Sequence, residues 1–184
     1  MTTALLMIDV QRAFDEAYWG IRNNPDAETN MKVLLDGWAR ANQPIVLVRH
    51  DATVPGSALA PGAPGNAFKP ELDGVRPDLM FAKNVNSAFH GEVDLHAWLT
   101  RRGIGAVVLA GIQTNMCVET TARVAGNLGY DTTVAIDATF TFDLAGPLGT
   151  VLTADQLAEA TAVNLHGGGF ATIATTATVL SGLN

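Results

Sequence analysis

The sequence has little of several features that define whole classes of protein. Only one of its 184 residues is cysteine, so no intramolecular disulfide can form, and a reducing cytoplasm is the expected compartment. Lys and Arg number 11 against 18 Asp and Glu, and a net charge of −7 argues against binding to nucleic acid. No apolar run approaches the roughly 20 residues of a membrane span. The first residues also lack the basic segment and cleavage site of a signal peptide.

What the sequence does have is the composition of a folded domain. Hydrophobic residues make up 48% of the chain and charged residues 16%, which excludes a disordered protein. A chain of this length can bury a substantial core. No repeat, low-complexity tract or linker divides it. We therefore predict that residues 1–184 form a single domain.

Short apolar runs alternate with helical periodicities along the chain. Buried strands are predicted at residues 4–10, 45–48, 107–110 and 133–136, with a weaker strand at 170–174. Helices are predicted at residues 27–41, 93–102, 116–128 and 154–165, the last with Thr153 as its N-cap. This alternation is typical of a parallel sheet covered on both faces. The predicted fold is α/β, a three-layer α/β/α sandwich with a mostly parallel, doubly wound central sheet.

A long segment between two of these elements shows no helical or strand periodicity in its apolar residues. Residues 53–76 are rich in Pro and Gly. In a compact domain such a loop is more often functional than idle. We therefore expect it to form a wall or a lid of a binding site.

The single cysteine stands where a strand gives way to a helix. Cys117 follows an apolar run that breaks at Gly111, and a helical pattern begins beside it. A thiol at a helix N-terminus faces the positive end of the helix dipole and unpaired N–H groups, which lower its pKa and can bind an oxyanion. The sequence therefore predicts a nucleophile at this position.

Two charged residues stand at the ends of other apolar runs. Asp9 ends the first strand, and ligands of a doubly wound sheet gather beyond the carboxyl ends of its strands. If the strands before Asp9 and Cys117 are neighbours, the carboxylate could act as a general base; capping its own strand is the structural alternative. Lys83 follows the run 79–82, and its ammonium could stabilise a thiolate or hold Asp9 in place. Because most lysines are solvated surface charges, spacing alone leaves both interpretations open.

Three motifs in order carry a family resemblance. Residues 9–14 read D-V-Q-R-A-F, residues 83–91 read K-N-V-N-S-A-F-H-G, and residues 111–123 read G-I-Q-T-N-M-C-V-E-T-T-A-R. They resemble the D-x-Q-x-x-F, K-x-x-x-S-A-F-x-G and G-x-x-T-x-x-C-V-x-x-T-x-R motifs of the isochorismatase-like cysteine hydrolases. That superfamily includes nicotinamidases, N-carbamoylsarcosine amidases, ureidoacrylate hydrolases and isochorismatase. The resemblance covers nearly the whole chain.

The resemblance implies a reaction and a site. It implies a catalytic triad of Asp9, Lys83 and Cys117 that cleaves a C–N bond of a small amide, carbamoyl or ureido compound through a thioester, without a cofactor. It also implies a cis peptide between Ile112 and Gln113, with the backbone N–H groups of Gln113 and Cys117 as the oxyanion hole. The implied partners are a small-molecule substrate and further copies of the chain, in a homodimer or homotetramer.

Two departures from particular family members narrow this expectation. Metal-dependent nicotinamidases carry a D-x-H pair after the second strand, whereas this chain reads Arg49-His50-Asp51. Neighbouring side chains of an extended segment point to opposite faces, so no metal site is expected. Isochorismatases proper generally lack the cysteine, so Cys117 favours an amidase-type reaction.

Three other functions stay open as alternatives. One is a vinyl-ether hydrolase of isochorismatase type, which would tolerate loss of the thiol. Another is a nucleotide-binding module, although no G-x-G-x-x-G follows the first strand. The third is a redox-sensing domain that uses Cys117 without turnover.

Residues beside the three motifs are candidates for the substrate pocket. Phe14, Trp19, Asn86 and Phe89 are predicted to bind substrate, because aromatic walls with one or two amides suit a small, neutral acyl group. Core packing explains each aromatic equally well.

The remaining polar candidates are predicted to be structural. His50 and His90 could line a pocket, but a hydrogen-bonded structural role is the favoured interpretation of each. His96 is expected on a helix surface and His166 in a helix-ending turn. Asp137 could face the crevice, but capping of the following turn through Thr139 is the favoured interpretation.

Overall fold

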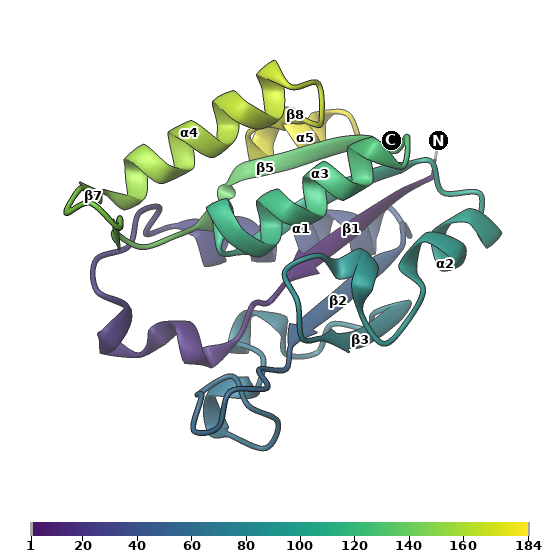
Figure 1. The fold of residues 1–184 in the computed structure, drawn as a ribbon. Helices are drawn as coiled ribbons and strands as arrows, with labels where there is room; N and C mark the ends of the chain where they lie inside the picture. Colours follow the sequence, from purple (N-terminus) through teal and green to yellow (C-terminus); the bar gives the residue numbers. More distant parts are fainter. Residues whose placement is uncertain (1, 184) are drawn as a thin grey trace.

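A single six-stranded sheet organises residues 2–183, the part of the chain that the computed structural model describes (Figure 1). Its strands are β1 (Thr3–Ile8), β2 (Ile45–His50), β3 (Leu79–Lys83), β4 (Ala106–Ile112), β5 (Asp131–Phe140) and β8 (Thr172–Ala174). They lie in the order β3-β2-β1-β4-β5-β8, and every neighbouring pair is parallel. The chain moves outward from β1 to β3 and then returns to β4, so the predicted doubly wound sheet is confirmed.

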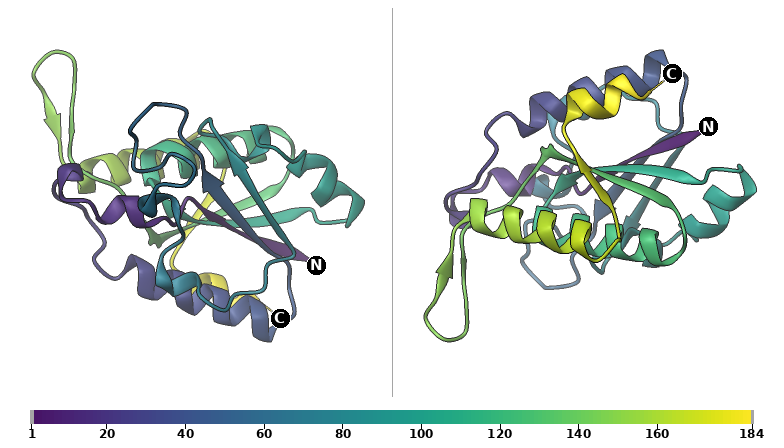
Figure 2. Two further views of the ribbon diagram at one scale, coloured as in Figure 1. Left: turned by 90° about the horizontal axis from the view of Figure 1, so that it is seen from below. Right: turned by 90° about the horizontal axis from the view of Figure 1, so that it is seen from above.

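Helices cover both faces of this sheet (Figure 2). Residues Leu5 and Met7 of β1 pack in the core that includes α1 (Ala27–Arg40) and is flanked by α5 (Thr176–Ser181). Leu6 and Ile8 point to the other face, where they share a core with α2 (Leu95–Arg101), α3 (Glu119–Asn127) and the end of α4 (Ala154–Gly167). This alternation of successive side chains produces the predicted three-layer sandwich.

The local sequence predicts where α4 begins, but it does not predict α5. Thr153 caps α4 in a full capping box with Gln156, as the pattern predicts. The short α5 has no such periodicity and depends on packing against α1. A Cβ atom on Gly37 would lie 2.3 Å from Leu180 Cδ2, so the glycine lets the Leu180 side chain pack directly against α1.

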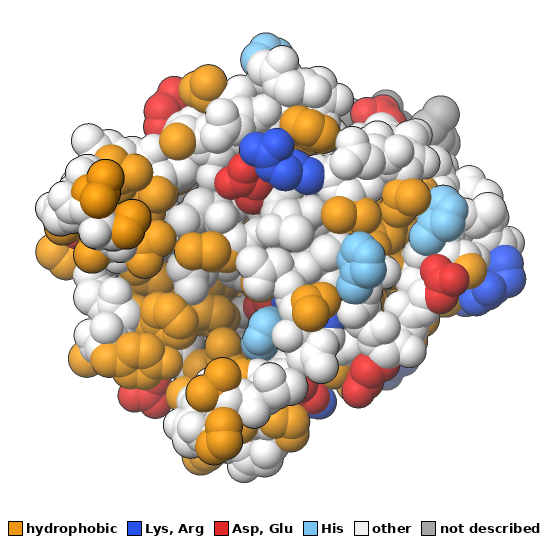
Figure 3. Space-filling model, in the orientation of Figure 1, with side chains coloured by type: hydrophobic (Ala, Val, Ile, Leu, Met, Phe, Trp, Pro, Cys, Tyr) orange, Lys and Arg blue, Asp and Glu red, His pale blue; other side chains and the backbone are white. Residues whose placement is uncertain are grey.

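A two-stranded hairpin projects from the body of the molecule (Figure 2). It consists of β6 (Leu144–Ala145) and β7 (Val151–Leu152), which pair antiparallel. Its tip residue Leu148 is 93% exposed. Figure 3 shows apolar side chains gathered on the side of the molecule where this hairpin lies. In the described part of the chain, no helix is long and apolar enough to cross a bilayer.

The two central strands approach each other closely at their carboxyl ends. Gly111 of β4 pairs with Ile8 of β1 and has a φ of +126°. A Cβ atom on Gly111 would lie 2.0 Å from the Ile8 carbonyl oxygen, so no larger residue fits. The segments that follow β1 and β4 therefore leave the sheet side by side, at the point where the chain reverses its direction across the sheet.

Candidate active site

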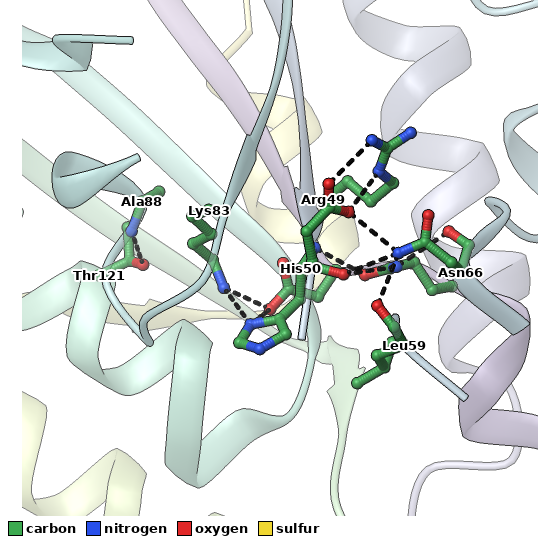
Figure 4. Close-up of polar contacts among 10 residues, drawn as sticks. Arg49, His50, Leu59, Asn66, Lys83, Ala88 and Thr121 are labelled. Carbon is green, nitrogen blue, oxygen red and sulfur yellow. Dashed lines mark hydrogen bonds and ion pairs between the residues drawn. The ribbon is translucent and has the colours of Figure 1, made fainter. Parts of the chain in front are cut away.

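A buried ion pair lies at this edge of the sheet. Asp9 follows β1 directly, with a φ of +51°, and Lys83 is the last residue of β3. The Lys83 Nζ atom lies 2.6 Å from Asp9 Oδ2, and the two side chains are 0% and 1% exposed (Figure 4). The second carboxylate oxygen, Asp9 Oδ1, is also buried, and no described residue donates to it. The pair thus leaves one oxygen of Asp9 free to take a proton.

The thiol of Cys117 lies beside this carboxylate. Cys117 belongs to a π-helical turn, Thr114–Val118, that follows β4 at once, and the peptide bond between Ile112 and Gln113 is cis, as expected. The thiol sulfur, a carboxylate oxygen of Asp9 and a ring nitrogen of His50 all lie within 4.8 Å of one another. The structure therefore brings Asp9, Lys83 and Cys117 together at one place.

Burial determines how the two acids of this cluster ionise. Burial raises the pKa of the Asp9 carboxyl above its usual range, and the Lys83 ammonium opposes this rise. Burial and the neighbouring Asp9 carboxylate raise the pKa of Cys117 to about 12, against the effect of Lys83. The resting thiol is therefore protonated, with the Asp9 carboxylate as its neighbour.

The expectation that a helix dipole lowers the pKa of Cys117 is wrong. The predicted helix at 116–128 is observed as the π-helical turn Thr114–Val118, which continues without a break into α3 at Glu119. Cys117 lies in the first turn of this helical segment, as predicted, but it is only 8% exposed. Loss of hydration and the neighbouring Asp9 carboxylate oppose formation of the thiolate there.

Motif residues outside the proposed triad hold the three segments in place. The Gln11 side chain accepts a hydrogen bond from His50 N and donates to His50 O, so it fixes the end of β2 beside β1. The Thr121 hydroxyl accepts a hydrogen bond from Ala88 N at 3.1 Å and joins the second motif to α3 (Figure 4). Arg123 forms an ion pair with Glu119.

The long loop is attached to the same edge. Asn66 donates hydrogen bonds to the His50 carbonyl at 3.1 Å and to the Asp51 carboxylate at 3.0 Å, and Gln11 donates to the Asn66 carbonyl at 2.9 Å (Figure 4). The loop therefore lies beside the ends of β1 and β2. Its role as a wall or lid stays a prediction.

The four predicted pocket residues lie in different surroundings. Phe14 and Trp19 form an aromatic cluster with Phe142, with ring centroids 5.1 to 6.5 Å apart. Trp19 is also held by a hydrogen bond from its Nε1 to the Ala13 carbonyl at 2.8 Å. Asn86 is exposed in the turn after β3. Contact between each of these residues and the substrate therefore stays a prediction.

Phe89 has a packing role that its sequence position does not reveal. Its ring stacks on Tyr130 at a centroid distance of 5.8 Å. Tyr130 directly precedes β5 and therefore lies at the amino end of the strands, opposite the edge that carries Cys117. This contact favours the structural interpretation, in which Phe89 packs between α2 and α3.

Among the other polar candidates, His50 lies at the site, which agrees with the alternative interpretation that it lines a pocket. Its Nδ1 atom lies 3.2 Å from Lys83 Nζ and 3.9 Å from Asp9 Oδ2, so it belongs to the site. The register of β2 and β3 pairs His50 with Lys83 and so explains this position.

The other four lie outside the cluster of Asp9, Lys83 and Cys117. His90 and His166 are exposed, and His96 contacts the Tyr130 hydroxyl at the surface. Asp137 is a cap, but it accepts from Thr176 at the start of α5 rather than acting through Thr139.

A metal ion does not fit this donor set. Asp9, His50 and Cys117 offer potential ligand atoms. The Lys83 ammonium already contacts the Asp9 carboxylate and lies 3.2 Å from the His50 ring, so a cation occupies the position between them. Asp51, the acidic neighbour of His50, instead binds Arg49 at 2.8 Å.

Comparison with known proteins assigns the family. Residues 3–176 match the isochorismatase domain, and the chain belongs to the isochorismatase family of hydrolases. It is 36% identical over 173 residues to the uncharacterised family protein YrdC of Bacillus subtilis, covering 94% of this chain and 91% of that one. It is 32% identical over 178 residues to nicotinamidase 3 of Arabidopsis thaliana, covering 90% and 81%. A crystal structure of a putative hydrolase of the family from Chromobacterium violaceum superimposes with a TM-score of 0.93 at 39% identity, covering 99% and 93%.

Proposed function

We propose that this hydrolase cleaves a C–N bond of a small amide, carbamoyl or ureido compound through a thioester on Cys117. The observation that carries the proposal is the buried Asp9–Lys83 pair with the Cys117 thiol beside it. A thiol with a pKa of about 12 is a thiolate in only about one molecule in 10⁵ at pH 7. The nucleophile therefore needs a base at the moment of attack, and Asp9 is the base in position.

The first half of the reaction forms the thioester. The thiol proton moves to Asp9, the sulfur–carbon bond forms, and the carbonyl π electrons move onto oxygen. The N–H groups of Gln113 and Cys117 are the proposed donors to that oxyanion. When the C–N bond breaks, the departing nitrogen takes the proton from Asp9, and the amine leaves.

The second half returns the enzyme to its starting state. Water gives a proton to Asp9 as its oxygen attacks the thioester carbonyl. The carbon–sulfur bond then breaks, the sulfur recovers the proton from Asp9, and the acid product leaves. Lys83 contacts the carboxylate of Asp9 and holds it in place in both halves.

The relatives support the same class of reaction. The matched nicotinamidase is by its name an amidase. The substrate of this chain is proposed only as a small molecule. A homodimer or homotetramer, a cytoplasmic location and the single-domain organisation stay predictions, and light scattering of the purified protein tests the first.

One experiment separates the proposed reaction from its alternatives. The protein is incubated with a panel of amides, carbamoyl amino acids, ureido acids, lactams and isochorismate, while released ammonia, amine and pyruvate are measured. Intact mass spectrometry monitors an acyl adduct on Cys117. We expect ammonia or an amine together with a transient adduct. Pyruvate release that persists in Cys117→Ala would establish the vinyl-ether reaction instead, and no turnover at all would favour a binding or redox role.

A further inference from the structure

His50 contacts the ion pair, but the mechanism above gives it no role. Its Nδ1 atom lies 3.2 Å from Lys83 Nζ, and Figure 4 shows the other ring nitrogen on the side away from Lys83. The His50 side chain is 19% exposed, whereas those of Lys83 and Asp9 are 0% and 1% exposed. His50 is therefore the member of this group of three that meets the solvent.

The contact with Lys83 specifies which ring nitrogen carries the proton. A lysine ammonium has three N–H donors and no acceptor, so Nδ1 must accept, and it can do so only without a proton of its own. A neutral ring then carries its proton on Nε2. No described residue forms a hydrogen bond with Nε2, and this atom is not among the buried polar atoms that lack a partner.

The charges around the ring keep it neutral. Burial and the Lys83 ammonium lower the pKa of His50, against the smaller effects of Asp9 and Asp51. Asp51 is already bound by Arg49 and by Asn66, so its charge is largely balanced. The Asp9 carboxylate is balanced by Lys83, and Cys117 is a neutral thiol. No unbalanced carboxylate of the described residues therefore faces the ring to draw a second proton onto it.

We propose that His50 positions Lys83 through Nδ1 and presents its Nε2–H as a neutral hydrogen-bond donor to an acceptor atom of the bound substrate. The donor half of this statement rests on the proposed function. An N–H directed out of a buried charged group suits a carbonyl oxygen better than an ammonium or another donor. His50 is thus a positioning residue for Lys83 and a determinant of specificity for acyl compounds with an acceptor group near the scissile bond.

The protonation of the ring is tested by nitrogen NMR of the whole protein labelled with ¹⁵N-histidine. The variant His50→Asn identifies the His50 signals among those of the four histidines. We expect a neutral ring with the proton on Nε2 at pH 7. A ring protonated on Nδ1, or on both nitrogens, overturns the proposal without any reference to turnover.

The donor is tested by alkylation of Cys117 with two small reagents. Iodoacetamide has a carbonyl acceptor, whereas iodoethane has none. Asparagine keeps an acceptor near the position of Nδ1 and removes the Nε2 donor, so His50→Asn should slow alkylation by iodoacetamide about 3- to 10-fold and leave alkylation by iodoethane unchanged. His90→Asn makes the same change at an exposed histidine and should alter neither rate.

Turnover then distinguishes the two roles of the ring. On an amide that the parent cleaves, His50→Asn should raise KM by a similar factor with kcat little changed. His50→Ala loses the acceptor for Lys83 as well and should lower kcat about 10-fold. Equal effects on both reagents, or none, overturn the donor role. If the parent cleaves no amide, the proposed function fails, while the NMR and alkylation results still decide the role of His50.

Discussion

Asp9→Asn gives the most direct test of how this site works. The substitution keeps the size of the side chain but removes the base, so attack depends on the thiolate that is already present. With the pKa of Cys117 at about 12, that fraction is about 10⁻⁵ at pH 7, which sets the upper limit of the loss. The carboxylate is itself one cause of the high pKa, so its removal brings the thiol pKa down. We therefore expect kcat to fall between about 10³- and 10⁵-fold.

The pH dependence of the residual activity makes the test specific. In the parent, activity should be flat above the raised pKa of Asp9 and fall as pH falls through it. In the variant, the rate should rise about tenfold for each pH unit between 7 and 9, because it follows the thiolate fraction. The assay is ammonia or amine release from an amide that the parent cleaves.

The same change should destabilise the protein. The neutral asparagine side chain would leave the buried Lys83 ammonium without its counter-charge, which costs about 3–5 kcal/mol. Urea unfolding at 25 °C measures this cost and shows whether the variant is folded in the assay. A folded variant whose kcat falls by less than tenfold, or whose residual rate does not change with pH, would refute the role of Asp9 as base.

Four further predictions follow from the same contacts. Cys117→Ala should abolish amide hydrolysis with no loss of folding by circular dichroism; turnover near that of the parent would exclude the thioester. Activity should survive exhaustive chelation. Activity that is lost on chelation and returns with zinc or manganese would contradict the conclusion that the ion pair leaves no room for a metal. Trp19→Ala should change the ranking of amides by kcat/KM, whereas Phe89→Ala should mainly lower the midpoint of thermal unfolding. The opposite pair of results would mean that Phe89 contacts the substrate and Trp19 is structural. Glu28→Gln should cost about 1–3 kcal/mol at pH 7 in urea unfolding and progressively less at lower pH; an equal cost at pH 7 and pH 3 would contradict it.

The Glu28 prediction depends on a charged cluster that joins separate segments. Although burial acts to raise it, hydrogen bonds from Arg22 and Lys69 lower the pKa of Glu28 to about 2, from a usual 4.5. A group with a lowered folded pKa stabilises the protein above its unfolded pKa. That contribution is lost as pH falls from about 4.5 through about 2. The glutamine variant lacks it at every pH, so the difference between the two proteins must shrink in acid.

Much of the fold could be predicted because its signals are local. Four central strands are short apolar runs, and the capping box of α4 is a local pattern. The hairpin β6–β7 and the helix α5 were not predicted, because their strands and turns are too short to show a period. The strand β5 extends over Asp131–Phe140, well beyond the apolar run at 133–136, because residues on both sides of that run still pair with β4.

In the candidate site, too, some features could be predicted from the sequence and others could not. Asp9, Lys83 and Cys117 could be identified because each lies at a boundary between elements and in a motif. The role of His50 could not be predicted, because it depends on which residue of β3 lies beside it. The register between β2 and β3 is set by the packing of the whole sheet. The pKa of Cys117 could not be predicted either, since it depends on burial by segments far away in the sequence.

The chemistry of this site follows from the order of its strands. Since β1 lies between β2 and β4, a carboxylate at the end of β1 has the end of β2 on one side and the turn after β4 on the other. Lys83 reaches that carboxylate from β3, across β2, and passes His50 on the way. Burial then keeps the proton on the thiol, and the ion pair keeps the carboxylate charged beside it. The proposed reaction therefore needs no preformed thiolate, because the proposed base and nucleophile are held together and the proton can move when a carbonyl arrives.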